Sequence, residues 1–126
     1  MARQLIFMIF ILALIAIASS IPNLRFASSE VVDVAIRKLG HVLAYGALGY
    51  LFGRLVMHGR FHPMARIWPW LAVVAIIGLA IADELNQGMV VGRQPSVMDV
   101  VLDAVGGSTG FLLAVGSRQA RYRPPS

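Results

Sequence analysis

The sequence predicts an all-α integral membrane protein, a four-helix bundle that crosses the bilayer four times and keeps both termini in the cytoplasm. Of the 126 residues, 58% are hydrophobic and only 13% are charged, whereas about a quarter of the residues of soluble domains are charged. The apolar residues form four runs, each close to the ~20 residues needed to cross a bilayer. Basic residues flank these runs, as the positive-inside bias predicts. We expect one domain covering residues 1–126.

The four predicted spans cover residues 5–21, 39–57, 67–85 and 97–115. The first has a second interpretation, because Arg3, the apolar stretch and the small residues Ala16 and Ala18 resemble a secretory signal with its cleavage site. We favour an uncleaved span, since the run continues to Ile21 and ends at Pro22 as a full span would. Cleavage would leave three spans.

Residues 22–38 form a polar connector before the second span. Ser29 can cap a helix, and Glu30, Asp33 and Arg37 recur at spacings of three and four, which places them on one helical face. The pattern predicts either a short amphipathic helix at the outer interface or an extension of the second span. We expect a solvated lead-in without a binding role.

Small residues in two of the spans predict close helix packing. Gly46, Gly49 and Gly53 lie in the second span, and Gly106 and Gly110 have the GxxxG spacing in the fourth. The third span opens with two tryptophans around a proline, at residues 68–70, which is typical of a helix start anchored at the membrane interface.

Composition excludes several classes of function. The net charge of +5 does not indicate nucleic-acid binding, because the arginines are scattered between apolar runs and form no basic face. The absence of cysteine excludes disulfides, thiolate metal sites and cysteine nucleophiles. His58 and His62 are four apart, but Gly59 and Pro63 disfavour a regular helix there, so a solvated basic loop is the favoured interpretation. We expect no cofactor, and no spacing marks a particular metal ion.

The basic residues also predict the orientation. With the N-terminus in the cytoplasm, the inner segments hold seven basic residues and no acid, and the outer segments hold four basic residues and all six acids. The inner set is Arg3, Arg54, Arg60, Arg66, Arg118, Arg121 and Arg123, and the outer set is Arg25, Arg37, Lys38 and Arg93. We therefore expect a multi-pass protein of the cytoplasmic (inner) membrane whose 82–110 stretch faces outward.

That outward stretch carries the candidate site. Asp83 and Glu84 end the third span, Asp99 and Asp103 begin the fourth, and His41 begins the second. Ionisable groups at this depth are expensive facing lipid, so we expect them to turn inward and meet. Asp99 has a structural alternative, since Ser96 three residues earlier gives a capping-box-like helix start.

We assign roles within this cluster as hypotheses. Glu84 is the candidate acid or base, with His41 as its proton partner. Arg93 positions an anionic substrate. The remaining ligand-binding candidates, which supply hydrogen bonds or charge around these three, are Lys38, Tyr45, Gln87, Asp99 and Asp103.

The ordered spacing of these residues resembles the VanZ-like family, small multi-span membrane proteins named for a member associated with teicoplanin resistance. The resemblance covers residues 37–110 and rests on Lys38-x2-His41-x3-Tyr45-x2-Leu48-Gly49 and on Asp83-Glu84-x2-Gln87-x4-Gly92-Arg93-x2-Ser96-x2-Asp99-x6-Gly106-x3-Gly110. Two positions depart from it: Arg37 stands where the family often has an acid, and Asp103 where it has asparagine. The resemblance implies a role facing the cell envelope and no particular reaction.

Three functions compete at this point. The first is an envelope protein that binds or modifies a lipid-linked or glycopeptide-type ligand at the outer face. The second is a structural or partner-binding membrane subunit whose polar cluster only holds helices together. Such a subunit can be part of an oligomer. The third, transport, is disfavoured because the inner halves of the spans are nearly all apolar apart from Ser108 and Thr109. The only partner that all three share is the lipid bilayer.

Overall fold

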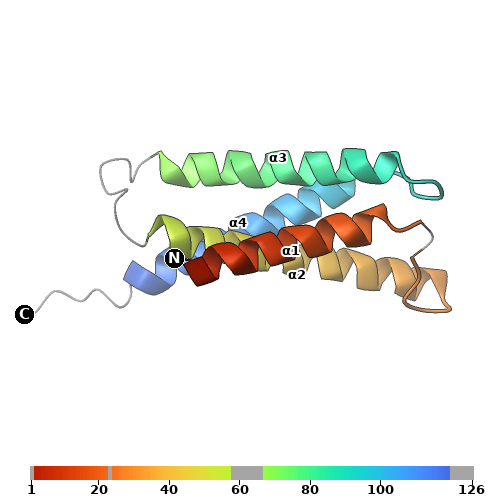
Figure 1. Cartoon of the computed structure of the whole chain (residues 1–126), viewed down its shortest axis with the longest axis horizontal. Coiled ribbons are helices and arrows are strands. Elements are labelled where there is room, and N and C mark those ends of the chain that lie inside the picture. The colour runs from red at the N-terminus through yellow and green to blue at the C-terminus, as the bar shows by residue number, and fades with distance from the viewer. Residues whose placement is uncertain (1, 23, 58–66, 120–126) are drawn as a thin grey trace, which may run out of the picture.

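The protein is built from four α-helices, seen here in a computed structural model that describes residues 2–22, 24–57 and 67–119 (Figure 1). Each helix is long and apolar enough to cross a membrane, and the described residues contain no strand. The all-α membrane architecture predicted from the sequence is therefore confirmed. The helices are α1 (Ala2–Ser20), α2 (Glu30–Val56), α3 (Trp68–Gly88) and α4 (Val97–Gln119).

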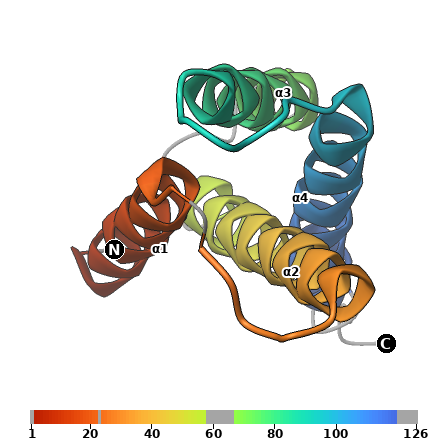
Figure 2. The ribbon, with the colours of Figure 1, turned by 90° about the vertical axis from the view of Figure 1, so that its right-hand side faces the viewer.

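The helices run alternately up and down, so that α1 begins and α4 ends at the same end of the bundle (Figure 1). The opposite end holds residues 21–22 and 24–29, which lie between α1 and α2, and the 89–96 connector between α3 and α4, and we call it the connector end. Seen from there, α2 crosses α4, α3 lies beside α4, and α1 lies on the far side of α2 from α4 (Figure 2). The candidate site residues of three helices therefore meet at one end of the bundle.

Glycines bring α2 and α4 together over their middle turns. A Cβ atom added at Gly49 would collide with the carbonyl oxygen of Gly107, and one added at Gly110 would collide with that of Gly46. A Cβ at Gly53 would lie 2.8 Å from the Cβ of Ala114. The expectation of close packing through small residues is confirmed, and the two helices approach backbone to backbone.

The core lies between the helices and is small. Its buried side chains are Ile15, Tyr45, Ala72, Ile76, Ala80 and Phe111. Large apolar side chains point outward along every helix; Phe10 is 62% exposed and Leu112 is 65% exposed. A soluble protein would bury such side chains, whereas lipid tails cover them at no cost. The exposed apolar surface thus agrees with a bilayer environment.

Helix α2 begins at Glu30, well before residue 39, where the apolar run starts. Of the two alternatives for residues 22–38, the extension of the second span is confirmed. The lead-in is more than solvated, because the Asp33 carboxylate is buried and accepts hydrogen bonds from the backbone N–H groups of Phe26 (2.5 Å) and Ala27 (3.3 Å). Arg37, one turn later, pairs with the same carboxylate at 3.1 Å. This clamp holds the α1–α2 connector against α2.

Candidate functional site

A polar pocket of about 620 Å³ lies at the connector end, between α2, α3, α4 and the 89–96 connector. Charged and hydrogen-bonding side chains dominate its walls. Its lining residues are Glu30, Val34, Arg37, Lys38, His41, Gln87, Gly92, Arg93, Gln94, Pro95, Ser96, Asp99, Leu102 and Asp103. Six of the predicted site residues (Lys38, His41, Gln87, Arg93, Asp99 and Asp103) are among them, while Glu84 and Tyr45 are not.

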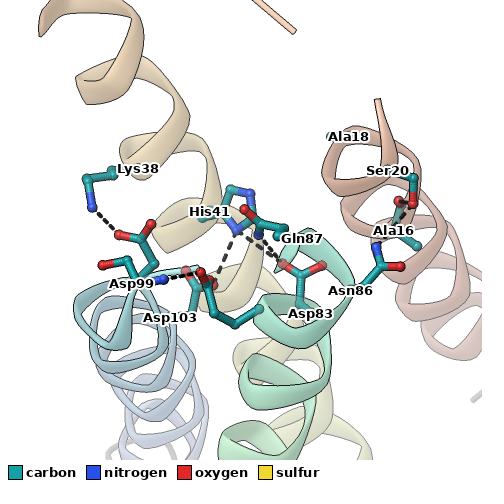
Figure 3. A network of polar contacts seen from close by, with 12 residues as sticks. Ala16, Ala18, Ser20, Lys38, His41, Asp83, Asn86, Gln87, Asp99 and Asp103 are labelled. Atoms are coloured by element: carbon teal, nitrogen blue, oxygen red, sulfur yellow. Dashed lines mark hydrogen bonds and ion pairs between the residues drawn. The ribbon is translucent and has the colours of Figure 1, made fainter. Parts of the chain in front are cut away.

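His41 of α2 stands between two carboxylates (Figure 3). Its Nδ1 atom lies 3.2 Å from Oδ2 of Asp103 on α4 and 3.5 Å from Oδ2 of Asp83 on α3. Both carboxylates are buried, with 3% and 8% of the side chain exposed, whereas the imidazole is 20% exposed. One ring nitrogen thus joins three helices at the floor of the pocket.

Lys38 pairs with Asp99 one turn nearer the connector end, and the pair joins α2 to α4 (Figure 3). Both side chains are partly exposed, at 35% and 27%. Asp99 therefore carries an interhelical ion pair. In a capping box its carboxylate would accept a hydrogen bond from the Ser96 N–H, but that N–H donates to another carboxylate.

That carboxylate belongs to Glu84. Its Oε1 atom accepts a hydrogen bond from the backbone N–H of Ser96, directly before the first turn of α4. A carboxylate at a helix N-terminus satisfies a donor that has no partner within the helix and complements the helix dipole. Glu84 is buried, and its structural contact differs from the proton partnership with His41 that the sequence suggested.

Arg93 reaches from the 89–96 connector back into the bundle. Gly92, with φ of 84°, turns the chain just before it, and the turn is closed by a hydrogen bond from the Arg93 N–H to the Val90 carbonyl. The guanidinium donates to Oε1 of Gln87 at 3.1 Å and to the carbonyl of Ala18 at 2.7 Å. Burial lowers the pKa of Arg93, with Arg37 acting in the same direction, but arginine stays protonated at any physiological pH.

Gln87 completes a path of polar contacts through all four helices. Its Nε2 donates to Oδ2 of Asp83 at 3.0 Å while its Oε1 accepts from Arg93. The path therefore runs from Asp103 on α4 to His41 on α2 and then to Asp83 and Gln87 on α3. From Gln87 it continues through Arg93 to the Ala18 carbonyl on α1. Beside it, Asn86 donates to Oγ of Ser20 at 3.1 Å (Figure 3).

Tyr45 lies one turn below His41 and belongs to the core. It is 2% exposed, and its ring stacks on the imidazole with 6.5 Å between the ring centroids and 17° between the planes. Its position supports the orientation of His41 from below. A direct contact between Tyr45 and a ligand in the pocket has no support from this geometry.

Two residues that belong to the polar cluster or the pocket were not assigned a role from the sequence. Asp83 was expected to turn inward with the other ionisable groups but received no role, and Arg37 was expected to belong to a solvated lead-in although it lines the pocket. The i, i+4 spacing of Asp33 and Arg37 was the available signal for the second. His58 and His62, weighed as a metal pair, lie outside the described residues.

A second, largely apolar cavity of about 330 Å³ adjoins the polar pocket between α1 and α2. Arg37, His41 and Arg93 line both cavities. The other lining residues are Leu14, Ile15, Ala18, Leu24, Phe26, Ile36, Gly40 and Ala44. The two adjoining cavities together form an amphiphilic space, with polar groups at one side and an apolar cavity beside them.

The contact between Glu84 and Ser96 gives a stability prediction. Glu84→Ala leaves the Ser96 N–H without its acceptor and should lower the free energy of unfolding by about 1–2 kcal/mol. Glu84→Gln keeps an oxygen acceptor and should retain most of that stability. Thermal unfolding of the detergent-solubilised variants measures both. No loss of stability in Glu84→Ala would contradict the capping role, whereas an equal loss in Glu84→Gln would show that the negative charge at the start of α4 contributes most of the stabilisation.

Comparison with known protein families gives a match. A family model described as VanZ/LLP1 matches residues 4–118, which is most of the chain. Among curated proteins and among solved structures, no match is found.

Proposed function

This chain belongs to the VanZ/LLP1 family, and from that premise we propose that it binds a lipid-linked ligand at the outer face of the cytoplasmic membrane. Its multi-pass architecture gives the membrane setting. The observation that carries the proposal is the pair of adjoining cavities that share Arg37, His41 and Arg93. A ligand with a polar headgroup and a hydrocarbon chain fills both cavities at once, and neither a free sugar nor a simple hydrocarbon does.

The charges of the polar pocket define the headgroup. Arg37, Lys38 and Arg93 supply cations, of which arginine is the side chain best matched to phosphate oxygens. Asp99 and Asp103 supply acceptors for hydroxyl groups. A headgroup that carries phosphate and hydroxyl groups satisfies both sets, as the headgroup of a lipid-linked saccharide does.

The apolar cavity accounts for the other half of the ligand. It opens between α1 and α2, and its walls are aliphatic and aromatic side chains such as Leu14, Phe26 and Ile36. A hydrocarbon chain there stays in apolar surroundings while its headgroup contacts Arg37 at the boundary. The role that we propose in the cell is to bind such a lipid in the envelope and thereby lower susceptibility to glycopeptides that act on envelope precursors.

A matched pair of arginine variants tests the proposal. Arg37 lines both cavities, whereas Arg25 is exposed in the connector at the same end and lines neither. Arg37→Gln should weaken binding of phosphatidylinositol, a phosphate- and hydroxyl-bearing probe lipid, about tenfold or more through the loss of a charge-assisted hydrogen bond. Arg25→Gln removes the same charge and should leave binding unchanged. Native mass spectrometry in detergent measures both, with phosphatidylcholine as the reference lipid.

The cellular arm uses the same two variants. Teicoplanin susceptibility of cells producing the wild-type chain should be lower than that of cells carrying an empty vector, and Arg37→Gln should remove the difference at equal protein level. The alternative function, a structural or partner-binding subunit, predicts equal lipid binding by both variants and phenotypes that follow protein abundance alone. Equal binding by Arg37→Gln and Arg25→Gln would therefore reject the ligand pocket.

A further inference from the structure

We propose that His41, Asp83 and Asp103 form a binding site for one divalent transition-metal ion, of which Zn²⁺ and Mn²⁺ fit best. One ligand atom from each residue lies within 4.8 Å of the other two. The imidazole Nδ1 is 3.2 Å from one carboxylate oxygen and 3.5 Å from the other. Ligand atoms about 2.0–2.2 Å from a tetrahedral ion lie about 3.3–3.6 Å apart, so each carboxylate oxygen already lies at about the distance from Nδ1 that a shared ion requires.

A single hydrogen on Nδ1 of His41 cannot satisfy both of the carboxylates that face it. Two carboxylates converge on the same nitrogen, and Nδ1 carries at most one hydrogen to donate. Oδ1 of Asp103 is buried and has no hydrogen-bond partner among the described residues. Two buried carboxylates against one imidazole cost free energy in a bilayer unless positive charge is added. A divalent ion supplies that charge and binds both oxygens and the nitrogen together.

Neighbouring residues hold the three donors in place, as supporting residues do around metal sites. Gln87 donates a hydrogen bond to the Asp83 oxygen that faces His41. Tyr45 stacks against the imidazole from below. Each donor also comes from a different helix, and the crossing of α2 and α4 fixes the separation of two of them.

The donor set selects the ion. A nitrogen donor disfavours Mg²⁺ and Ca²⁺, which prefer all-oxygen surroundings. The absence of cysteine removes the soft ligands that Cu⁺ prefers. One imidazole with two carboxylates suits Zn²⁺ or Mn²⁺, and three protein ligands leave coordination positions for oxygen atoms from outside. Because His41 and Asp103 also line the polar pocket, an ion held there is within reach of the phosphate of a headgroup; this last step rests on the proposed function.

Metal binding is measured without any lipid, on the full chain in detergent and without a polyhistidine tag. A His58→Gln, His62→Gln background removes the other two histidines of the sequence. We expect one Zn²⁺ or Mn²⁺ per chain by elemental analysis after dialysis, and Co²⁺ as a spectroscopic probe should give visible absorption bands. Mg²⁺ in millimolar excess should displace little of the bound ion.

Two asparagine substitutions on α4 make the matched comparison. Asp103→Asn removes a proposed ligand, while Asp99→Asn removes a carboxylate of the same pocket that pairs with Lys38. Asp103→Asn should weaken Zn²⁺ binding by a factor of about 100 or more and abolish the Co²⁺ bands, and Asp99→Asn should leave both unchanged. Gln87→Leu, which removes only a supporting hydrogen bond, should cost about tenfold.

Asp83→Asn and His41→Gln keep the inference testable if one variant does not fold, and size-exclusion chromatography identifies the folded ones. Folded wild-type protein that takes up none of the three ions overturns the inference. Binding that survives Asp103→Asn or Asp83→Asn as well as it survives Asp99→Asn overturns it too. The outcome is separable from that of the lipid test, because Arg37→Gln should leave the metal stoichiometry intact.

Discussion

Replacing Gly49 with alanine should destabilise the protein by up to about 2 kcal/mol, although alanine is the better helix former. The added methyl group collides with the backbone carbonyl of Gly107, which cannot rotate away as a side chain does. The helix-propensity gain of alanine over glycine is about 1 kcal/mol. Overpacking typically costs 1–3 kcal/mol, and α2 and α4 can relieve it only by moving apart. The steric cost therefore outweighs the propensity gain.

The same substitution at Gly78 and Gly40 provides the control. A Cβ atom at either position has nothing within 4 Å, so Gly78→Ala and Gly40→Ala should raise stability slightly through helix propensity. Thermal unfolding in detergent compares the three. Opposite signs are expected for Gly49→Ala and Gly78→Ala. A melting temperature for Gly49→Ala at or above that of the wild type would show that the two helices do not cross at this glycine.

The number and class of the helices follow from hydropathy, but their ends do not. The apolar runs predict four spans because a stretch of about 20 apolar residues in a helix has few alternatives to a bilayer. Helix α2 nevertheless starts at Glu30, since a helix continues through polar residues whose side chains find partners. Asp33 finds them in two backbone N–H groups and in Arg37. Hydropathy measures apolarity, and helix ends depend on such local contacts.

The sequence predicts which charged residues lie at the connector end and how deep they lie, but not which of them contact one another. Asp83 and Glu84 are neighbours in the sequence, and the sequence favoured Glu84 as the partner of His41. Adjacent residues on an α-helix point about 100° apart, so only one of the two can face α2. The rotation of α3 gives that place to Asp83 and directs Glu84 to the start of α4. That rotation is set by packing against three other helices, which no local pattern encodes.

Backbone partners were beyond sequence reasoning altogether. Arg93 was assigned to ligand binding on the strength of its charge and depth. Its guanidinium also donates to the carbonyl of Ala18, in the last turn of α1. Every helix end presents carbonyl groups that lack partners within the helix, so the sequence offers no means of choosing this one among them.

Arg93→Leu removes the hydrogen bond to the Ala18 carbonyl, and we expect the C-terminal end of α1 to detach from the bundle as a result. In a bilayer, the apolar face of α1 gains little by packing on α2 or α3, because lipid tails are equally apolar. Directional polar contacts then decide where the helix sits. Arg93 supplies hydrogen bonds to Ala18 and Gln87, each worth about 1.5–3 kcal/mol when the donor is charged. Its guanidinium also places positive charge at the negative end of the α1 dipole.

A cross-linking reporter measures the detachment directly. Ser20 and Asn86 touch across α1 and α3 at 3.1 Å, and the sequence contains no cysteine. In a Ser20→Cys, Asn86→Cys background, a short thiol-reactive cross-linker should join the two positions efficiently. Adding Arg93→Leu should reduce the yield several-fold, and Arg25→Leu, at an exposed position of the same end, should not. An unchanged cross-linking yield with Arg93→Leu would mean that apolar packing alone holds α1 in place. The apolar cavity between α1 and α2 would then not depend on the hydrogen bond from Arg93 to Ala18.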